Sequence, residues 1–188
     1  MTRDIIINAI MASFSTTNIP AAHDVVIGSS GEAITTKSIF IGKAWTNLNP
    51  DELIVENSAL GYLSDAAFRY YLPAYMMLLL DDIQRADMVA SSVVHQLTLP
   101  LEVDQLRLMN FLAQSTYTQQ DLGQFLLDEL RNSTANVAFF IRRTALFTPQ
   151  QGHCINMFLI GLSEFYPDYY DQGEPLMASQ RYWFKYKL

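Results

Sequence analysis

Apolar residues recur along this chain at intervals of three and four, which is the spacing that places side chains on one face of a helix. Segments with this spacing cover most of the sequence, and they are residues 4–14, 50–61, 64–82, 86–97, 101–112, 118–130, 135–147 and 149–166. The residues expected to face the core of two of these helices are Phe68, Tyr71, Leu72, Leu78, Leu79, Phe158 and Leu159. We therefore expect a mainly α fold, a single-domain multi-helix bundle over residues 1–188.

Capping residues stand at the predicted starts of four of these helices, where a side-chain oxygen can accept a hydrogen bond from a free backbone N–H. They are Asn49, Ser64, Thr118 and Thr148. Within 64–82, Pro73 lacks an N–H and disfavours helical geometry at Leu72. We expect a kink there, or two helices that abut at Pro73.

Residues 25–41 are the part of the chain in which a strand competes with a helix. Val25, Val26 and Ile27 are β-branched and are followed by Gly28, which is typical of a short strand before a turn. Residues 34–45 fit a helical face only loosely. A minor β element near residues 25–41 is therefore compatible with the sequence.

The charge balance limits the classes of partner. The chain has 188 residues, with 12 Lys and Arg against 19 Asp and Glu, and a formal net charge of −7. Nonspecific binding to nucleic acid needs clustered basic residues, so we expect no nucleic-acid partner. The negative charge favours a basic partner instead.

The sequence also indicates a compartment. Cys154 is the only cysteine, so no internal disulfide can form, which suits a reducing compartment. The longest apolar run, Leu72–Leu80, has nine residues, less than half the length that spans a bilayer. Asp4 and Asn8 interrupt the apolar N-terminal segment, so it makes a poor secretory signal. We therefore expect a cytoplasmic protein with no membrane contact.

Three aspartates are the only acids whose spacing suggests a metal site. Asp81, Asp82 and Asp87 offer carboxylate oxygens that suit a hard cation. Adjacent aspartates on a helix point about 100° apart, however, so a solvated helix end is the stronger interpretation, and Arg69 is a candidate polar partner for one of them. No nucleotide-binding or hydrolase motif accompanies them, and we expect neither a metal nor a cofactor.

Cysteine and tyrosine residues have both a structural and a chemical interpretation. Cys154 follows His153 directly, and neighbours on a helix face differently, so we expect a buried thiol and no Cys–His pair. Tyr70 and Tyr75 are expected in the core, since large aromatic residues chiefly serve burial. The rival hypothesis is a small enzyme or ligand-binding protein whose pocket lies near Tyr70, Tyr75, Asp81 and His95.

The segment after Pro167 is the best candidate for a partner-binding surface. It combines tyrosines, which are enriched in interface hot spots, with acids that would attract a basic partner. The candidate residues are Asp168, Tyr169, Tyr170, Asp171 and Glu174. The alternative is a polar loop whose tyrosines fold back onto the core, and the sequence favours neither.

Several segments together resemble a family of small, mostly bacterial proteins of unknown function. The most specific is Phe68-Arg69-Tyr70-Tyr71-Leu72-Pro73-Ala74-Tyr75 followed by Asp81-Asp82, and the others are Trp45, Phe147-Thr148-Pro149-Gln150-Gln151 with Phe158-Leu159, and Tyr182-Trp183. The resemblance implies a helical fold. It implies no substrate, cofactor or catalytic residue.

Taken together, these observations favour a non-enzymatic protein-interaction module. Its most concrete form is an immunity or antitoxin-type protein that neutralises a basic toxin domain, because the acidity and the tyrosine-rich acidic loop suit such a partner. The ligand-binding hypothesis is the runner-up. A homodimer with a structural role is a third hypothesis.

Overall fold

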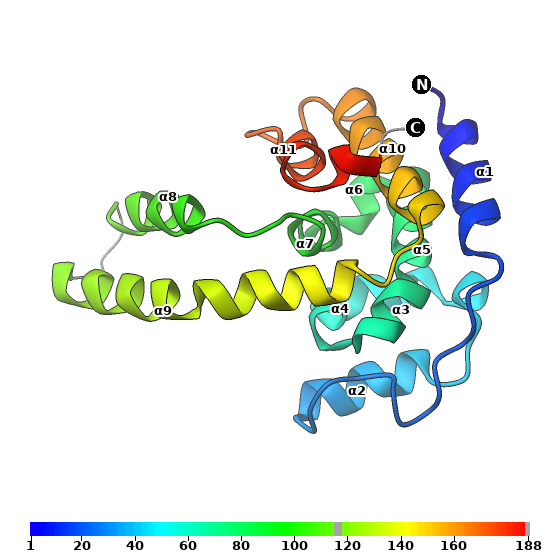
Figure 1. Ribbon diagram of the computed structural model, residues 1–188, viewed down its shortest axis with the longest axis horizontal. Coiled ribbons are helices and arrows are strands. Elements are labelled where there is room, and N and C mark those ends of the chain that lie inside the picture. The colour runs from blue at the N-terminus through cyan, green and yellow to red at the C-terminus, as the bar shows by residue number, and fades with distance from the viewer. Residues whose placement is uncertain (115–117, 187–188) are drawn as a thin grey trace. The chain divides into compact units, whose positions relative to one another are not determined.

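The computed structural model describes residues 1–114 and 118–186, and its helices form two compact units (Figure 1). Unit 1 consists of Met1–Thr98 and Arg143–Leu188, and unit 2 of Leu99–Arg142. Every regular element in the described ranges is helical, and the β structure there is one isolated antiparallel bridge between Val26 and Leu63. The prediction of a mainly α fold is therefore confirmed.

The helices of unit 1 come from both ends of the chain. They are α1 (Arg3–Phe14), α2 (Gly31–Phe40), η1 (Trp45–Asn47), α3 (Pro50–Val55), α4 (Ala59–Tyr62), α5 (Asp65–Asp81), α6 (Ile83–Ala86), α7 (Met88–Gln96), α10 (Pro149–Phe165), α11 (Glu174–Arg181) and η2 (Trp183–Tyr186). Unit 2 is a helical hairpin of α8 (Glu102–Leu112) and α9 (Gln119–Thr144), the last two residues of which are assigned to unit 1.

Helix α5 is the centre of the core of unit 1. Twelve of its 17 residues are buried, and all seven residues predicted to face the core, on α5 and on α10, are buried. The Tyr71 hydroxyl donates to the carbonyl oxygens of Phe40 (2.6 Å) and Lys43 (3.2 Å). This contact ties the end of α2 to α5 and explains how so polar an aromatic group is accommodated in the core.

Of the two outcomes expected at Pro73, the pair of abutting helices is wrong, because α5 continues through the proline as one helix. An internal proline removes one helical hydrogen bond and costs about 3 kcal/mol in an exposed helix. Here Leu72, Pro73 and Ala74 are all buried, and the burial of apolar area offsets that cost. Tertiary packing overrides the local signal.

Two other sets of predicted helix boundaries are wrong, and the possibility left open near residues 25–41 is resolved. The predicted helix over 50–61 is divided into α3 and α4, while the predicted helices over 118–130 and 135–147 are one helix, α9. Residues 31–40 form α2, so the minor β element near residues 25–41 is reduced to the bridge at Val26.

All four predicted N-caps are confirmed. The Ser64 hydroxyl accepts from the backbone N–H of Ala67 (3.1 Å), and the Asn49 side chain accepts from that of Asp51 (3.0 Å). Thr118 and Thr148 each form a reciprocal capping box with the residue three positions later.

Gln151, three residues into α10, also joins distant parts of unit 1. Its side chain is 1% exposed. Its Oε1 accepts from the Nε of Arg69 (2.9 Å), and its Nε2 donates to the Ser13 carbonyl (3.2 Å) and to the Thr17 hydroxyl (3.0 Å). Arg69 therefore pairs with the amide of Gln151. The sequence had suggested that its partner would be one of the nearby aspartates.

Candidate functional site

The loop between α10 and α11 carries the five residues that the sequence singled out, and the structure gives them different environments. Asp168 and Asp171 are exposed, and Glu174 is half-buried at the start of α11. Tyr169 is half-buried and Tyr170 is buried. The carboxylates of Asp168 and Asp171 therefore face solvent, whereas the two tyrosines fold back to different extents.

Tyr170 fixes the loop to the core. Its side chain is 7% exposed, and its hydroxyl donates to the carbonyl oxygen of Ala90 on α7 (3.5 Å). Burial raises the pKa of the Tyr170 phenol well above its ordinary value. For Tyr170, then, the structure agrees with the alternative in which the side chain serves the fold.

Tyr169 occupies an intermediate position. Its hydroxyl donates to the backbone carbonyl of Asp87 (3.1 Å), and its ring meets that of Tyr170 edge to face at 5.0 Å. Burial, followed by the charge of Asp87, raises the pKa of its phenol. The ring is oriented by these contacts and still remains partly accessible to a partner.

A hollow of about 420 Å³ lies beside this loop. It is lined by Gln84, Phe165, Tyr166, Pro167, Asp168 and Tyr169. Three aromatic rings and an exposed carboxylate thus border one depression. This combination suits an organic cation, because ring faces attract positive charge and a carboxylate can pair with it.

The chain itself places a cation on two of these rings. The guanidinium carbon of Arg3 lies 5.1 Å from the ring centroid of Tyr166 and 5.6 Å from that of Phe165. Both distances fall within the usual range of cation–π contacts. Arg3 lines the apolar groove described next and is not among the residues that line the hollow.

A second depression is an apolar groove of about 530 Å³ between α1, α5 and the η1–α3 segment. Apolar side chains from all three parts line it, including Ile7, Trp45 and Leu78. Its charged groups are Arg3 and Asp81. The size and lining are those of a site for a mostly apolar small molecule.

The residues of the rival pocket hypothesis do not share this groove. Asp81 lines it, but Tyr70, Tyr75 and His95 are not among its lining residues. Tyr70 and Tyr75 are buried within unit 1, whereas His95 is exposed on α7. The groove was not predicted because its walls come from helices far apart in the sequence.

The candidate reactive groups lie in ordinary structural environments. Cys154 is 1% exposed, and burial raises the pKa of its thiol to about 12, so almost no thiolate is present at neutral pH. Asp82 caps α6 by accepting from the backbone N–H of Arg85 (3.0 Å). Across residues 1–114 and 118–186, no three His, Cys, Asp or Glu side chains are grouped as metal ligands would be.

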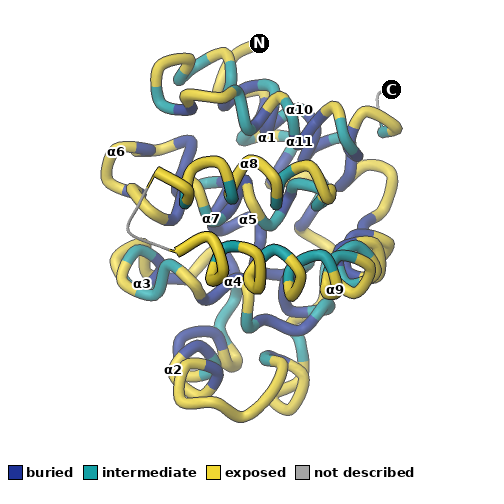
Figure 2. Tube along the Cα trace, turned by 90° about the vertical axis from the view of Figure 1, so that its left-hand side faces the viewer, coloured by how far each residue is buried: buried dark blue, intermediate teal, exposed yellow. Residues whose placement is uncertain are grey.

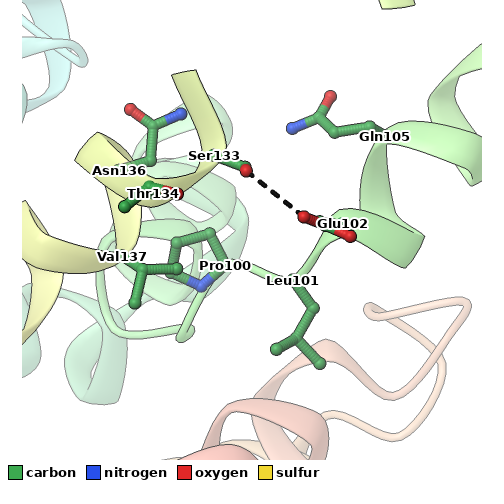
Figure 3. A pocket seen from close by; sticks show the side chains of 8 residues that line it. All are labelled: Pro100, Leu101, Glu102, Gln105, Ser133, Thr134, Asn136 and Val137. Atoms are coloured by element: carbon green, nitrogen blue, oxygen red, sulfur yellow. Dashed lines mark hydrogen bonds between the residues drawn. The ribbon is translucent and has the colours of Figure 1, made fainter. Parts of the chain in front are cut away.

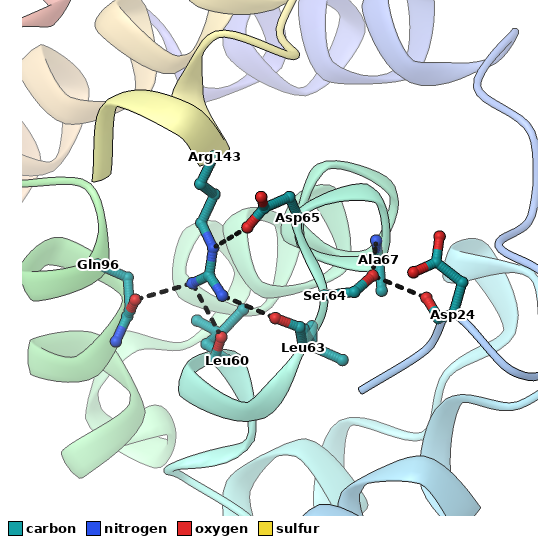
Figure 4. A network of polar contacts seen from close by, with 8 residues as sticks. All are labelled: Asp24, Leu60, Leu63, Ser64, Asp65, Ala67, Gln96 and Arg143. Atoms are coloured by element: carbon teal, nitrogen blue, oxygen red, sulfur yellow. Dashed lines mark hydrogen bonds and ion pairs between the residues drawn. The ribbon is translucent and has the colours of Figure 1, made fainter. Parts of the chain in front are cut away.

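Arg143 is an important residue that the sequence analysis missed. It is 1% exposed and donates to the carbonyl oxygens of Leu60 (3.2 Å) and Leu63 (2.7 Å) and to the Gln96 side chain (3.0 Å) (Figure 4). Its Nε lies 3.6 Å from Asp65. Because these partners belong to unit 1 and surround the guanidinium, we assign Arg143 a role in stability. Arg143 directly follows Arg142 in the sequence, and this pair of arginines gives no local signal that one of them is buried.

Gln84, Phe165 and Tyr166 are the lining residues of the hollow that the sequence analysis did not identify. The only available signal was the aromatic pair directly before Pro167.

Comparison with known proteins gives a family and no activity. The sequence model described as a family of unknown function, DUF6714, matches residues 28–121. No curated protein and no solved structure matches the chain. In the part of the chain that the structure describes, no helix is both long and apolar enough to cross a membrane.

Proposed function

We propose that this chain, which belongs to the family of unknown function DUF6714, is a non-enzymatic protein-interaction module that binds a basic protein domain. In its most specific form, the proposal is an immunity or antitoxin-type protein that occludes a basic toxin domain. This proposal places the protein in the bacterial cytoplasm, where its single cysteine stays reduced. The observation that carries the proposal is the hollow beside Asp168, with its aromatic rings and exposed carboxylate.

In this proposal an arginine or lysine side chain of the partner enters the hollow. Its cationic group pairs with the Asp168 carboxylate and lies against the rings of Tyr166 and Tyr169. Arginine is favoured over lysine, because a planar guanidinium can both stack on a ring and form two parallel hydrogen bonds to a carboxylate. Tyr170 contributes indirectly by holding the loop in place.

The net charge of −7 supports the same kind of partner at longer range. Opposite net charges speed the diffusional encounter of two proteins, and salt screens this effect. Asp168 and Asp171, which are exposed, are the loop carboxylates best placed to contribute. We therefore expect association to slow as ionic strength rises.

The first test is affinity capture from the native host followed by binding kinetics at low and high salt. Neutralisation of the loop by Asp168→Asn with Asp171→Asn should lower the association rate, whereas Tyr169→Ala should mainly raise the dissociation rate. Asp24→Asn with Glu32→Gln, which removes two exposed acids outside the hollow, is the matched control. Recovery of no basic protein, or kinetics unchanged by the loop variants, would contradict the proposal.

The apolar groove favours a second candidate function, the binding of an amphipathic small molecule. Its mostly apolar walls would hold the body of the ligand, and Arg3 or Asp81 would pair with a charged head group. Native mass spectrometry of the freshly purified protein tests this directly. A bound molecule that is lost in Ala74→Phe, a variant that fills the groove, would support ligand binding over partner binding.

A further inference from the structure

The apolar groove of unit 1 is lined by two rows of side chains, and each row has one charged residue at an end. On α1 the row consists of Arg3, Ile7 and Met11, which are spaced four residues apart on one helical face. On α5 the row runs from Ala74 to Asp81. At the rise of an α-helix, each row is about 10–12 Å long.

Tyr166 brings the two charged ends together. The guanidinium carbon of Arg3 lies 5.1 Å from the centroid of the Tyr166 ring, and the hydroxyl of that ring donates to the carbonyl oxygen of Leu79 (3.4 Å). Leu79 precedes Asp81 by only two residues on α5. Arg3 and Asp81 therefore lie at the same end of the groove, and the other lining residues are apolar except for Thr46.

Both charges are available to a ligand. Within residues 1–114 and 118–186, the side chains of Arg3 and Asp81 form no hydrogen bond or ion pair. Cation–π contacts with Phe165 and Tyr166 hold the Arg3 guanidinium but use none of its N–H donors. Asp81 is the last residue of α5, where the helix dipole disfavours a carboxylate and a cation would be stabilising.

The walls of the groove are held in place by the core of unit 1. Ile6, Ile10 and Phe14 are 0% exposed and anchor α1, so buried, half-buried and exposed residues follow one another along this helix (Figure 2). Helix α5 is mostly buried. A groove with fixed walls loses little conformational freedom when a ligand enters, which favours binding.

The hollow of unit 2 is less suited to an apolar ligand. Its volume is about 250 Å³, and five of its eight lining residues are polar, among them Glu102, Gln105 and Asn136 (Figure 3). A ligand with a large apolar body would therefore bury more apolar area in the groove of unit 1.

We infer that the groove binds a zwitterionic amphiphile, a molecule with an apolar body and a head in which an anionic group stands beside an ammonium group. The anionic group accepts hydrogen bonds from Arg3, and the ammonium group pairs with Asp81. The body lies against Ile7, Met11 and Trp45. A head of one sign would meet a like charge at one of the two residues. This inference rests on the ligand binding proposed above as the second candidate function and names the class of ligand.

The test is calorimetric titration of the full chain with three probes below their micelle concentrations. They are dodecylphosphocholine, dodecyl phosphate and dodecyltrimethylammonium, which share one tail and differ in the charge of the head. We expect the zwitterion to bind about tenfold more tightly than either of the others. Arg3→Gln should weaken the zwitterion and the phosphate only, and Asp81→Asn the zwitterion and the ammonium only. Asp24→Asn, an exposed acid outside the groove, is the control.

Ala74→Phe, which fills the groove, should abolish the binding of all three probes. Circular dichroism checks that each variant is folded, and Met77→Trp fills the groove in its place if Ala74→Phe unfolds. Equal affinities for the three probes, lost when the groove is filled, would overturn the inference and leave ligand binding in place. If no probe binds the wild type, both the inference and the second candidate function are wrong.

Discussion

Tyr71 and Tyr75 lie one turn apart on α5, and their hydroxyl groups have opposite surroundings. Both side chains are 0% exposed. The Tyr71 hydroxyl donates to two backbone carbonyls, whereas that of Tyr75 has no hydrogen-bond partner among the described residues. Burial raises the pKa of both phenols, to about 12 for Tyr71. An unsatisfied buried hydroxyl costs about 1–3 kcal/mol, while a satisfied one contributes about 1 kcal/mol.

Removing these two hydroxyl groups should therefore change stability in opposite directions. We expect Tyr75→Phe to raise the free energy of unfolding by about 1 kcal/mol and Tyr71→Phe to lower it by about 1–2 kcal/mol. Urea denaturation of the two variants beside the wild type measures both changes. A destabilised Tyr75→Phe would mean that its hydroxyl has a partner, such as an internal water molecule.

Arg142 and Arg143 are neighbours in the sequence with opposite burial, because Arg143 is buried and Arg142 is exposed. We expect Arg143→Ala to lower the free energy of unfolding by about 3–5 kcal/mol, since it removes a buried guanidinium, its ion pair with Asp65 and its hydrogen bonds to two carbonyls. Arg142→Ala should cost less than about 1 kcal/mol. Equal melting curves for the two variants would refute the structural role of Arg143.

Among the helices, two glycines test how closely neighbouring elements pack. A Cβ atom added at Gly123 on α9 would have no atom within 4 Å, whereas one at Gly152 on α10 would lie 2.6 Å from the ring of Tyr186. Gly123→Ala should stabilise its helix by about 0.5–1 kcal/mol. Gly152→Ala should destabilise unit 1 by about 1–3 kcal/mol, because the ring of η2 must move.

The two glycine variants need different measurements, since they lie in different units. Slower hydrogen exchange of the α9 amides would report the gain in Gly123→Ala, and a lower urea midpoint would report the loss in Gly152→Ala. If Gly152→Ala is as stable as the wild type, then η2 does not pack on α10 as the structure shows.

The helices also show which features the sequence could predict. Helix starts were predicted correctly at Ser64 and Thr148, because a cap depends on residues that are only three positions apart. The sequence left open whether the helix continues through Pro73, because that depends on burial by distant segments. The same reason applies to the candidate site. The exposed Asp168 could be suggested from composition, but the burial of Tyr170 against α7 could not.

For the molecule as a whole, the buried phenols and the thiol make stability sensitive to alkaline pH. Burial raises the pKa of Cys154 from 9.0 and that of Tyr71 from 10.0, both to about 12. Above about pH 9 the unfolded chain therefore releases protons that the folded chain retains, and stability falls as the pH rises toward about 12. Urea midpoints at about pH 8 and about pH 10.5 should show the decline, and equal midpoints would contradict it.

The position of Arg143 has a consequence for the order in which the protein is made. Its carbonyl partners Leu60 and Leu63 precede it by 83 and 80 residues, so a ribosome completes their segment long before their donor exists. Until then, these carbonyls and Gln96 lack the group that later joins them. A nascent chain that ends before Arg143 therefore lacks this donor, and α8 and most of α9 are synthesised while these groups are still without it.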